Sequence, residues 1–258
     1  MKRHTHLLAL AALCSLSSLQ AQNAQPAQPA TTAPVAPLPP QKPDEAAPKM
    51  DQKTGEPQAG FIGAHVRFVD IAKQNTAKVL FLGDSITAGW GGQKAIWDAA
   101  FGQYSPANFG IGGDRTQHVL WRITNGEFDG FTPKTVVLMI GTNNSGSDSA
   151  EGIAAGVTKI VETLRQKSPS TKVLLLAVFP RGEKASPNPG REKLAAVNAS
   201  IAKLDDGKNV HFLDIGAKFL EADGSLSKEI MPDFLHLSAK GYQIWADAIS
   251  PSLAKLME

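Results

Sequence analysis

Cysteine is almost absent from this 258-residue chain, and its scarcity excludes several kinds of site. The single cysteine, Cys14, lies in an apolar N-terminal stretch. If that stretch is cleaved off, the mature chain has no disulfide, no thiolate metal site and no cysteine nucleophile. Leu13 stands where lipoprotein signals carry a small residue, so we do not expect lipid attachment at Cys14.

Motifs for nucleotide and metal chemistry are also missing. No Gly-Lys-Ser/Thr occurs, and the glycines at 110, 112 and 113 lack the third glycine of a dinucleotide-binding loop. Within the expected domain, no two histidines have the H-x-x-x-H or H-E-x-x-H spacing of zinc enzymes. We therefore expect no metal and no cofactor, and we disfavour a zinc deacetylase.

An excess of charge of either sign is absent as well. Without Lys2 and Arg3, which lie in the N-terminal stretch, the 26 basic residues become 24, equal to the 24 acidic residues. A balanced chain of this kind gives no reason to expect nucleic-acid binding or attraction to anionic membranes.

The N-terminus has the layout of a secretory signal over residues 1–21. Two basic residues precede an apolar run from Leu7 to Leu13, and small or polar residues lead to Ala21. The run is too short to span a bilayer, so no integral membrane segment should remain after cleavage. We expect cleavage after Ala21, with Ala24 as the alternative, and a periplasmic or secreted product.

Residues 22–59 are rich in Pro, Ala, Gln and Thr and contain few large apolar side chains. Such a segment cannot bury enough surface to offset the entropy cost of ordering. We predict a disordered, extended linker without a catalytic role, followed by one folded domain over 60–258.

Apolar, β-rich runs alternate with amphipathic segments throughout that domain. The alternation predicts an α/β fold with three layers, α/β/α, around a five-stranded parallel sheet. Strands are expected at 78–83, 107–110, 135–140, 172–178 and 209–214. Helices are expected at 61–73, 85–101, 114–125, 149–167, 190–205 and 238–256, the second of them irregular because of its glycines.

The domain is organised around the first strand and the turn that ends it. Val79 to Leu82 form an apolar run, and Gly83-Asp84-Ser85 follows at the carboxyl end, where ligands gather in open α/β sheets. Ser85 is therefore a candidate nucleophile, without the Gly-x-Ser-x-Gly elbow of α/β-hydrolases. The alternative is that Asp84 or Ser85 only caps the following helix, and this stretch alone leaves the two interpretations about even.

Three further elements follow other strands of the predicted sheet: Gly112-Gly113-Asp114, Gly141-Thr142-Asn143, and the pair Asp233 and His236. Each alone is more simply interpreted as a turn or a helix cap. Parallel strands bring all of them to one edge, where they would supply a nucleophile, oxyanion donors, an acid and a base. That combination predicts ester hydrolysis.

These elements resemble the signature blocks of the SGNH (GDSL-type) hydrolases. Residues 108–122, 179–184 and 233–237 are, in addition, similar to the catalytic α subunits of type I platelet-activating-factor acetylhydrolase. The similarity covers roughly 61–258 and implies a flavodoxin-like SGNH hydrolase fold. It also hints at a homodimer.

The resemblance implies a role for each matched residue. Ser85 would be the nucleophile, and its own backbone N–H would donate to the oxyanion. Gly113 would donate through its backbone N–H and Asn143 through its side-chain amide. His236 would serve as general base and acid, and Asp233 would orient it.

Substrate contacts are harder to assign. We expect Ile86 and Leu235 to line a small acyl pocket, and we also place Asp84 on the substrate side. Arg181 and Arg115 could meet a polar or anionic leaving group, although exposed arginines are more often simply solvated.

The function predicted from the sequence is an exported serine esterase for short, most plausibly acetyl, esters on a glycan or polysaccharide. The similar acetylhydrolase subunits are intracellular, which puts a phospholipid substrate in doubt more than the chemistry. One alternative is a phospholipid acetylhydrolase or lysophospholipase. Another, of a different class, is a non-catalytic glycan-binding or envelope scaffold domain.

Overall fold

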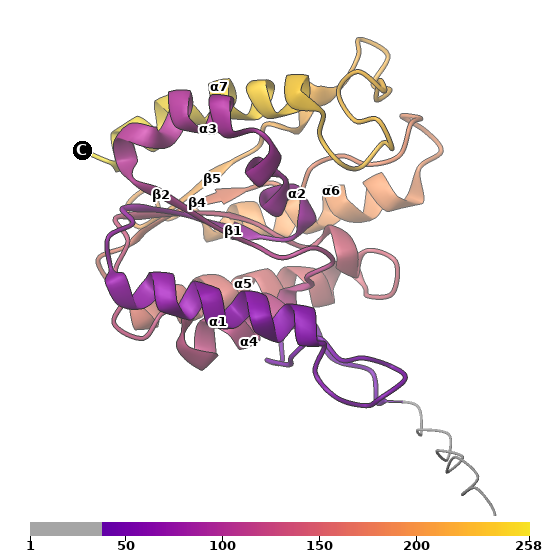
Figure 1. The fold of residues 1–258 in the computed structure, drawn as a ribbon. Coiled ribbons are helices and arrows are strands. Elements are labelled where there is room, and N and C mark those ends of the chain that lie inside the picture. The colour runs from indigo at the N-terminus through magenta and orange to yellow at the C-terminus, as the bar shows by residue number, and fades with distance from the viewer. Residues whose placement is uncertain (1–37) are drawn as a thin grey trace, which may run out of the picture. The chain divides into compact units, whose positions relative to one another are not determined.

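The computed structural model describes residues 38–258, so the predicted signal peptide and the linker up to residue 37 lie outside the described residues. Five parallel strands form one sheet in the order β2-β1-β3-β4-β5 (Figure 1). They are β1 (Val79–Gly83), β2 (Pro106–Gly110), β3 (Thr135–Met139), β4 (Lys172–Leu176) and β5 (Val210–Leu213).

Helices connect successive strands and cover both faces of the sheet. The α-helices are α1 (Ala59–Gln74), α2 (Ser85–Ala88), α3 (Lys94–Phe101), α4 (Thr116–Arg122), α5 (Ala150–Lys167), α6 (Pro189–Ile201) and α7 (Ala239–Leu256). The shorter helical segments are η1 (Gly89–Gly92), η2 (Gly102–Tyr104), η3 (Ile123–Glu127), η4 (Thr142–Asn144), η5 (Ala202–Leu204) and η6 (Gly216–Phe219).

The central strand β1 is buried on both faces, as its unbroken apolar run predicts. Helices α3 and α7 cover one face of the sheet, and α1, α4 and α5 cover the other (Figure 1). Val79 and Phe81 belong to the core beneath α3 and α7, whereas Leu80 and Leu82 belong to the core beneath α1, α4, α5 and α6. Successive side chains of a strand face opposite sides, so one short run fills both cores.

The structure confirms the predicted α/β class and the five-stranded parallel sheet. Each observed strand begins and ends within two residues of its predicted bounds. The stretch 85–101, predicted to be an irregular helix, is divided into α2, η1 and α3, with the division at the glycines. Of residues 38–258, no helix is both long enough and apolar enough to cross a membrane.

The structure differs from the linker prediction over residues 38–58, which we call the N-terminal strap. This segment packs along the domain instead of extending as a spacer. Its contacts are largely polar: the Ala47 N–H donates to the Gln117 carbonyl, and Thr116 Oγ1 donates to the Pro43 carbonyl over 2.7 Å. The prediction weighed only apolar burial, and the strap is held instead by backbone groups that bond to α4.

A fully buried ionic cluster lies between α4 and the ends of β1 and β2. Arg122 on α4 donates to Asp114 Oδ2 over 3.0 Å and to Glu127 Oε2 over 2.7 Å. Its remaining nitrogen donates to the Phe109 carbonyl, and Glu127 also contacts His65 Nδ1. Every charge in this cluster therefore has an oppositely charged or hydrogen-bonding partner, as burial requires.

We expect Arg122→Met to lower the free energy of unfolding by about 3–5 kcal/mol, because Asp114 and Glu127 would remain buried without their shared cation. Urea unfolding curves would measure the change. Lys159→Met is the matched control, since Lys159 pairs with Glu162 on the surface and its loss should cost less than about 1 kcal/mol. Equal effects of the two substitutions would contradict the prediction.

Candidate active site

Three side chains from the two ends of the domain meet at the carboxyl edge of the sheet. Ser85 Oγ lies 2.9 Å from His236 Nε2, although the two residues are 151 positions apart. On the far side of the imidazole, His236 Nδ1 lies 2.7 Å from Asp233 Oδ2. A proton on Nδ1, held by the carboxylate, leaves Nε2 free to accept the serine proton.

The turn before Ser85 leaves no room for a larger residue at position 83. A Cβ on Gly83 would lie 2.3 Å from Thr87 Oγ1 and 2.4 Å from the Met139 carbonyl oxygen. Asp84 Oδ1 accepts the Ile86 N–H and caps α2, so Ser85 occupies the first helical position. The helix-cap interpretation is therefore right for Asp84, while the half-buried Ser85 contacts His236.

Neighbouring elements hold α2 in place from two sides. Asn108 in the middle of β2 donates from Nδ2 to the Thr87 carbonyl over 3.0 Å. The Tyr242 hydroxyl on α7 donates to the Ile86 carbonyl over 2.6 Å. These bonds fix the backbone that carries the Ser85 hydroxyl and N–H.

Asp233 orients His236 through the backbone as well as through the imidazole. Its Oδ1 accepts the N–H of His236 over 2.7 Å and that of Leu235 over 3.1 Å. Desolvation raises the pKa of Asp233, but hydrogen bonds from the His236 side chain and from these two amides outweigh it and lower the pKa overall. Asp233 therefore remains a carboxylate at neutral pH and keeps Nδ1 protonated.

The two loops predicted to donate to an oxyanion flank Ser85. A Cβ built on Gly112 would lie 3.9 Å from Ser85 Cβ, and Gly113 next to it has φ +73°. Asn143, in η4 after β3, donates from Nδ2 to the Asp114 carbonyl over 2.8 Å and lies 3.4 Å from Asp84 Oδ2. The Asn143 amide therefore bridges the loops that follow β1, β2 and β3.

Asn144, beside Asn143, is a residue whose role the sequence did not reveal. Its Oδ1 accepts the Thr116 N–H at the start of α4 over 3.0 Å, and its Nδ2 donates to Gln117 and Asp148. It thereby ties the loop after β3 to the loop after β2. Its position directly after Asn143 was the only available signal.

The structure corrects two of the predicted substrate contacts. Asp84 is 0% exposed and Ile86 is 1% exposed. Asp84 caps α2, and Ile86 packs into the core beneath α3 and α7, so neither side chain faces a substrate. Leu235 is half-buried beside His236, and the exposed part of its side chain is compatible with contact to an acyl group.

Arg181 makes its hydrogen bonds to other residues of the protein. Its Nη1 donates to the Thr142 carbonyl over 3.1 Å and lies 3.3 Å from both Thr142 Oγ1 and Ser145 Oγ. The guanidinium thus braces the turn that carries Asn143, which differs from the predicted contact with a leaving group. Arg115 is half-buried at the start of α4.

No group of three or more His, Cys, Asp or Glu side chains that could hold a metal occurs within residues 38–258. The contacts of Ser85, His236 and Asp233 place a hydroxyl, an imidazole and a carboxylate in one line, beside the N–H donors predicted for the site. Such an arrangement suits acyl transfer.

Comparison with known proteins adds independent evidence. Residues 81–244 match the model of the GDSL-like lipase/acylhydrolase family. The chain is 41% identical over 202 residues to the alpha2 subunit of platelet-activating factor acetylhydrolase IB from Rattus norvegicus, covering 77% of this chain and 85% of the relative. It is 40% identical over 198 residues to the human alpha1 subunit, covering 76% and 84%.

Solved structures share the fold at lower identity. A GDSL-like lipase from Bacteroides thetaiotaomicron superposes with a TM-score of 0.63 at 20% identity, covering 76% of this chain and 98% of that one. An acetyl-xylooligosaccharide esterase from Geobacillus superposes with a TM-score of 0.56 at 19% identity, covering 70% and 94%. Both confirm the predicted fold.

Asp84 is a buried titratable group next to Ser85. Burial raises the pKa of Asp84 to about 7, and the charge of Asp114 adds to the increase, whereas the Ile86 N–H and His236 oppose it. In an unfolded chain the same carboxyl has a pKa of about 4. The folded state therefore binds this proton more tightly, and Asp84 lowers the free energy of unfolding as the pH rises from about 4 to 7.

We expect Asp84→Asn to remove this pH dependence, because asparagine keeps an acceptor for the Ile86 N–H but carries no charge. Relative to the original chain, the variant should gain about 2–3 kcal/mol of unfolding free energy between pH 5 and pH 8. Urea unfolding of both proteins at the two pH values measures the gain. If the difference in unfolding free energy between the two proteins is the same at pH 5 and at pH 8, the prediction is wrong.

Proposed function

The chain belongs to the GDSL-like lipase/acylhydrolase family and is a carboxylic ester hydrolase, and we propose that Ser85, His236 and Asp233 carry out the hydrolysis. The observation that carries the proposal is the continuous chain of contacts, 2.9 Å from Ser85 to His236 and 2.7 Å from His236 to Asp233. No other residues are needed to move the proton.

In the first step, Ser85 Oγ bonds to the ester carbonyl carbon while its proton passes to His236 Nε2. The imidazolium formed in this way is stabilised and oriented by the Asp233 carboxylate. Nε2 then returns the proton to the leaving alkoxide as the carbon–oxygen bond breaks. A water molecule, deprotonated by the same nitrogen, then bonds to the acyl carbon, and the bond to Ser85 Oγ breaks as Nε2 returns the proton to Oγ and the acid leaves.

The negative oxygen of the tetrahedral intermediate would receive three N–H donors. We assign the backbone N–H groups of Ser85 and Gly113 and the side-chain amide of Asn143. The bonds that fix the surrounding loops, from Asn144 and Arg181, support this assignment because donors that are held in advance need no reorganisation during the reaction.

We propose acetyl as the acyl group and a glycan hydroxyl as the acceptor. The names of the sequence relatives and of a structural neighbour, acetylhydrolase and acetyl-xylooligosaccharide esterase, both describe the removal of acetyl groups. The predicted export of the chain would bring it to polysaccharides, and the proposal of a glycan depends on that export. A homodimer stays a prediction from the resemblance.

The second candidate is a phospholipid acetylhydrolase or a lysophospholipase. It is favoured by the 41% identity to a platelet-activating factor acetylhydrolase subunit, which exceeds the identity to the carbohydrate esterase. A non-catalytic glycan-binding or envelope scaffold domain is the candidate from another class. The contacts between Ser85, His236 and Asp233 disfavour it, since a binding module does not need them.

We expect the chain to release acetate from an acetylated glycan, and Ser85→Ala to reduce the release by about 10⁴-fold or more, because the nucleophile is lost. Acetate release from acetylated xylan, other acetylated glycans and an acetylated phospholipid would measure both effects. The control Ser170→Ala changes a serine outside the site residues.

Each outcome of this panel selects one candidate. Release from the phospholipid alone would replace the glycan proposal by the phospholipid one. No hydrolysis of any substrate in the panel or of p-nitrophenyl acetate, together with glycan binding, would favour the scaffold domain.

Acyl-chain length gives a separate test of the acetyl proposal. We expect kcat/KM to fall from p-nitrophenyl acetate to butyrate and hexanoate, because we place the half-buried Leu235, next to His236, at the acyl group, where its side chain would restrict a long chain. The same series with Leu235→Ala should show a weaker decline. Faster cleavage of the longer esters by the original chain would contradict the acetyl preference.

A further inference from the structure

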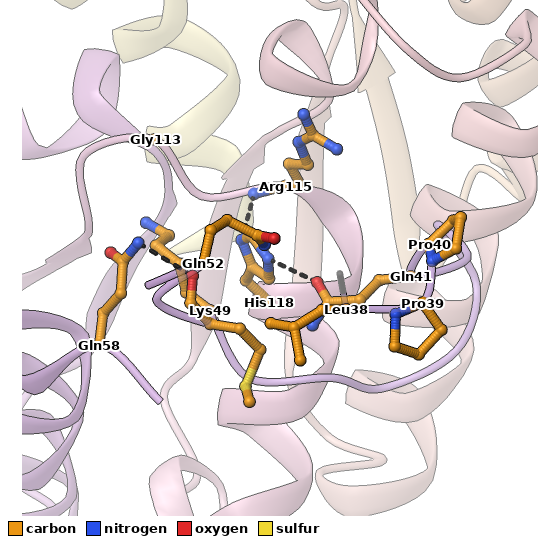
Figure 2. A pocket seen from close by; sticks show the side chains of 11 residues that line it. Leu38, Pro39, Pro40, Gln41, Lys49, Gln52, Gln58, Gly113, Arg115 and His118 are labelled. Carbon is orange, nitrogen blue, oxygen red and sulfur yellow. Dashed lines mark hydrogen bonds between the residues drawn. The ribbon is translucent and has the colours of Figure 1, made fainter. Parts of the chain in front are cut away.

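The N-terminal strap brings a lysine to the loop that carries Gly113. Together with Gly113, Arg115 and His118, the strap lines a cavity of about 570 Å³, and Lys49 is one of the strap residues that line it (Figure 2). The strap precedes residues 81–244, which match the family model. Lys49 therefore lies outside the matched segment, whereas the loop that it contacts lies within it.

Lys49 makes three contacts there and is only 12% exposed at its side chain. Its Nζ donates to the Gly112 carbonyl over 2.6 Å and lies 2.8 Å from Asp114 Oδ1. The ammonium also lies 5.6 Å from the centre of the Phe61 ring. A cation that is so nearly enclosed is fixed in position, unlike the freely solvated lysines of most surfaces.

The carbonyl that accepts from Lys49 belongs to the same peptide group as the Gly113 N–H. That group is planar and trans, so its C=O and N–H point in opposite directions. Anchoring the Gly112 oxygen therefore fixes the direction of the Gly113 hydrogen. The anchor matters because glycines stand on both sides of the peptide, and glycine allows the rotation that would turn the N–H away.

We propose that Lys49 is a positioning residue that holds the Gly112–Gly113 peptide with its N–H directed at the oxyanion. This inference rests on the proposed function, in which Gly113 is one of the donors. The Lys49 ammonium that donates to the carbonyl oxygen also draws electron density from the peptide group. The Gly113 N–H thereby becomes a stronger donor.

Asp114 connects this anchor to the other donor. Its carboxylate lies between Lys49 and Arg122, and its backbone carbonyl accepts from Asn143 Nδ2. A shift of the Gly112–Asp114 loop would therefore move the acceptor that holds the Asn143 amide. Removing Lys49 should weaken oxyanion stabilisation through both donors.

The alternative is that Lys49 only stabilises the fold. To separate the two, kcat and KM for p-nitrophenyl acetate are measured on the full chain and on Lys49→Met, Lys49→Arg and Lys53→Met. Lys53→Met is the matched control, because Lys53 is exposed in the same strap. Urea unfolding at the assay temperature gives the folded fraction of each protein.

We expect Lys49→Met to lower kcat by about 10- to 100-fold per folded molecule with KM changed less than about twofold, a partial loss compared with removal of a whole oxyanion donor. Lys49→Arg retains a cation and N–H donors and should recover most of kcat. Lys53→Met should match the original chain. A kcat for folded Lys49→Met within twofold of the original would overturn the inference.

If Lys49→Met does not stay folded, Lys49→Gln replaces it, since its amide removes the charge and is too short to reach the Gly112 carbonyl. A kcat equal to that of the original chain would overturn the inference in the same way, and a loss of about fivefold or more would support it.

Failure of the proposed function gives a different pattern from failure of this inference. An original chain that is inactive on every ester, or a Ser85→Ala variant that remains active, contradicts the proposed function. An active original chain and an inactive Ser85→Ala variant, combined with an unaffected Lys49→Met, contradict only the role of Lys49.

Discussion

Asp114 lies at the point on which the geometry of the site depends. Its carboxylate is 0% exposed, and burial raises its pKa while Arg122 and Lys49 lower it. Because a buried carboxylate needs compensating charges, one cation comes from α4 and the other from the N-terminal strap. These two ion pairs thus hold the loop between β2 and α4 in place. They thereby also position the Gly113 N–H and the Asp114 carbonyl that accepts from Asn143.

The sheet order explains why the reacting groups converge. In the order β2-β1-β3-β4-β5, β1 lies between β2 and β3, so the chain leaves β1 in one direction and later crosses to the other side. A crevice opens at such a reversal, beyond the carboxyl ends of the strands. Ser85 follows β1, Gly113 follows β2 and Asn143 follows β3, and the segment before α7 adds Asp233 and His236.

The fold and the reacting residues could be predicted because their signals are local. Apolar runs indicate the strands, and polar or glycine-rich turns follow them. Contacts between distant segments could not be predicted in this way. Lys49 stands among prolines and polar residues, with nothing nearby to indicate a buried carboxylate 65 positions later, and Arg181 cannot be distinguished in sequence from a solvated arginine. The burial of Asp84 and Ile86 follows from the packing of α2, which the sequence does not show.

The exposure of the imidazole–carboxylate pair to solvent determines how Asp233 acts on His236. The side chains of His236 and Asp233 are 45% and 56% exposed. Water beside the pair raises the local dielectric constant, and dissolved ions screen it, so the Asp233 charge attracts an imidazolium less strongly than an enclosed carboxylate would. The orientation of the imidazole ring must then depend more on hydrogen-bond geometry than on electrostatic attraction. The two backbone N–H groups that fix Asp233 Oδ1 provide that geometry, and they hold the ring in place equally well in dilute and in concentrated salt.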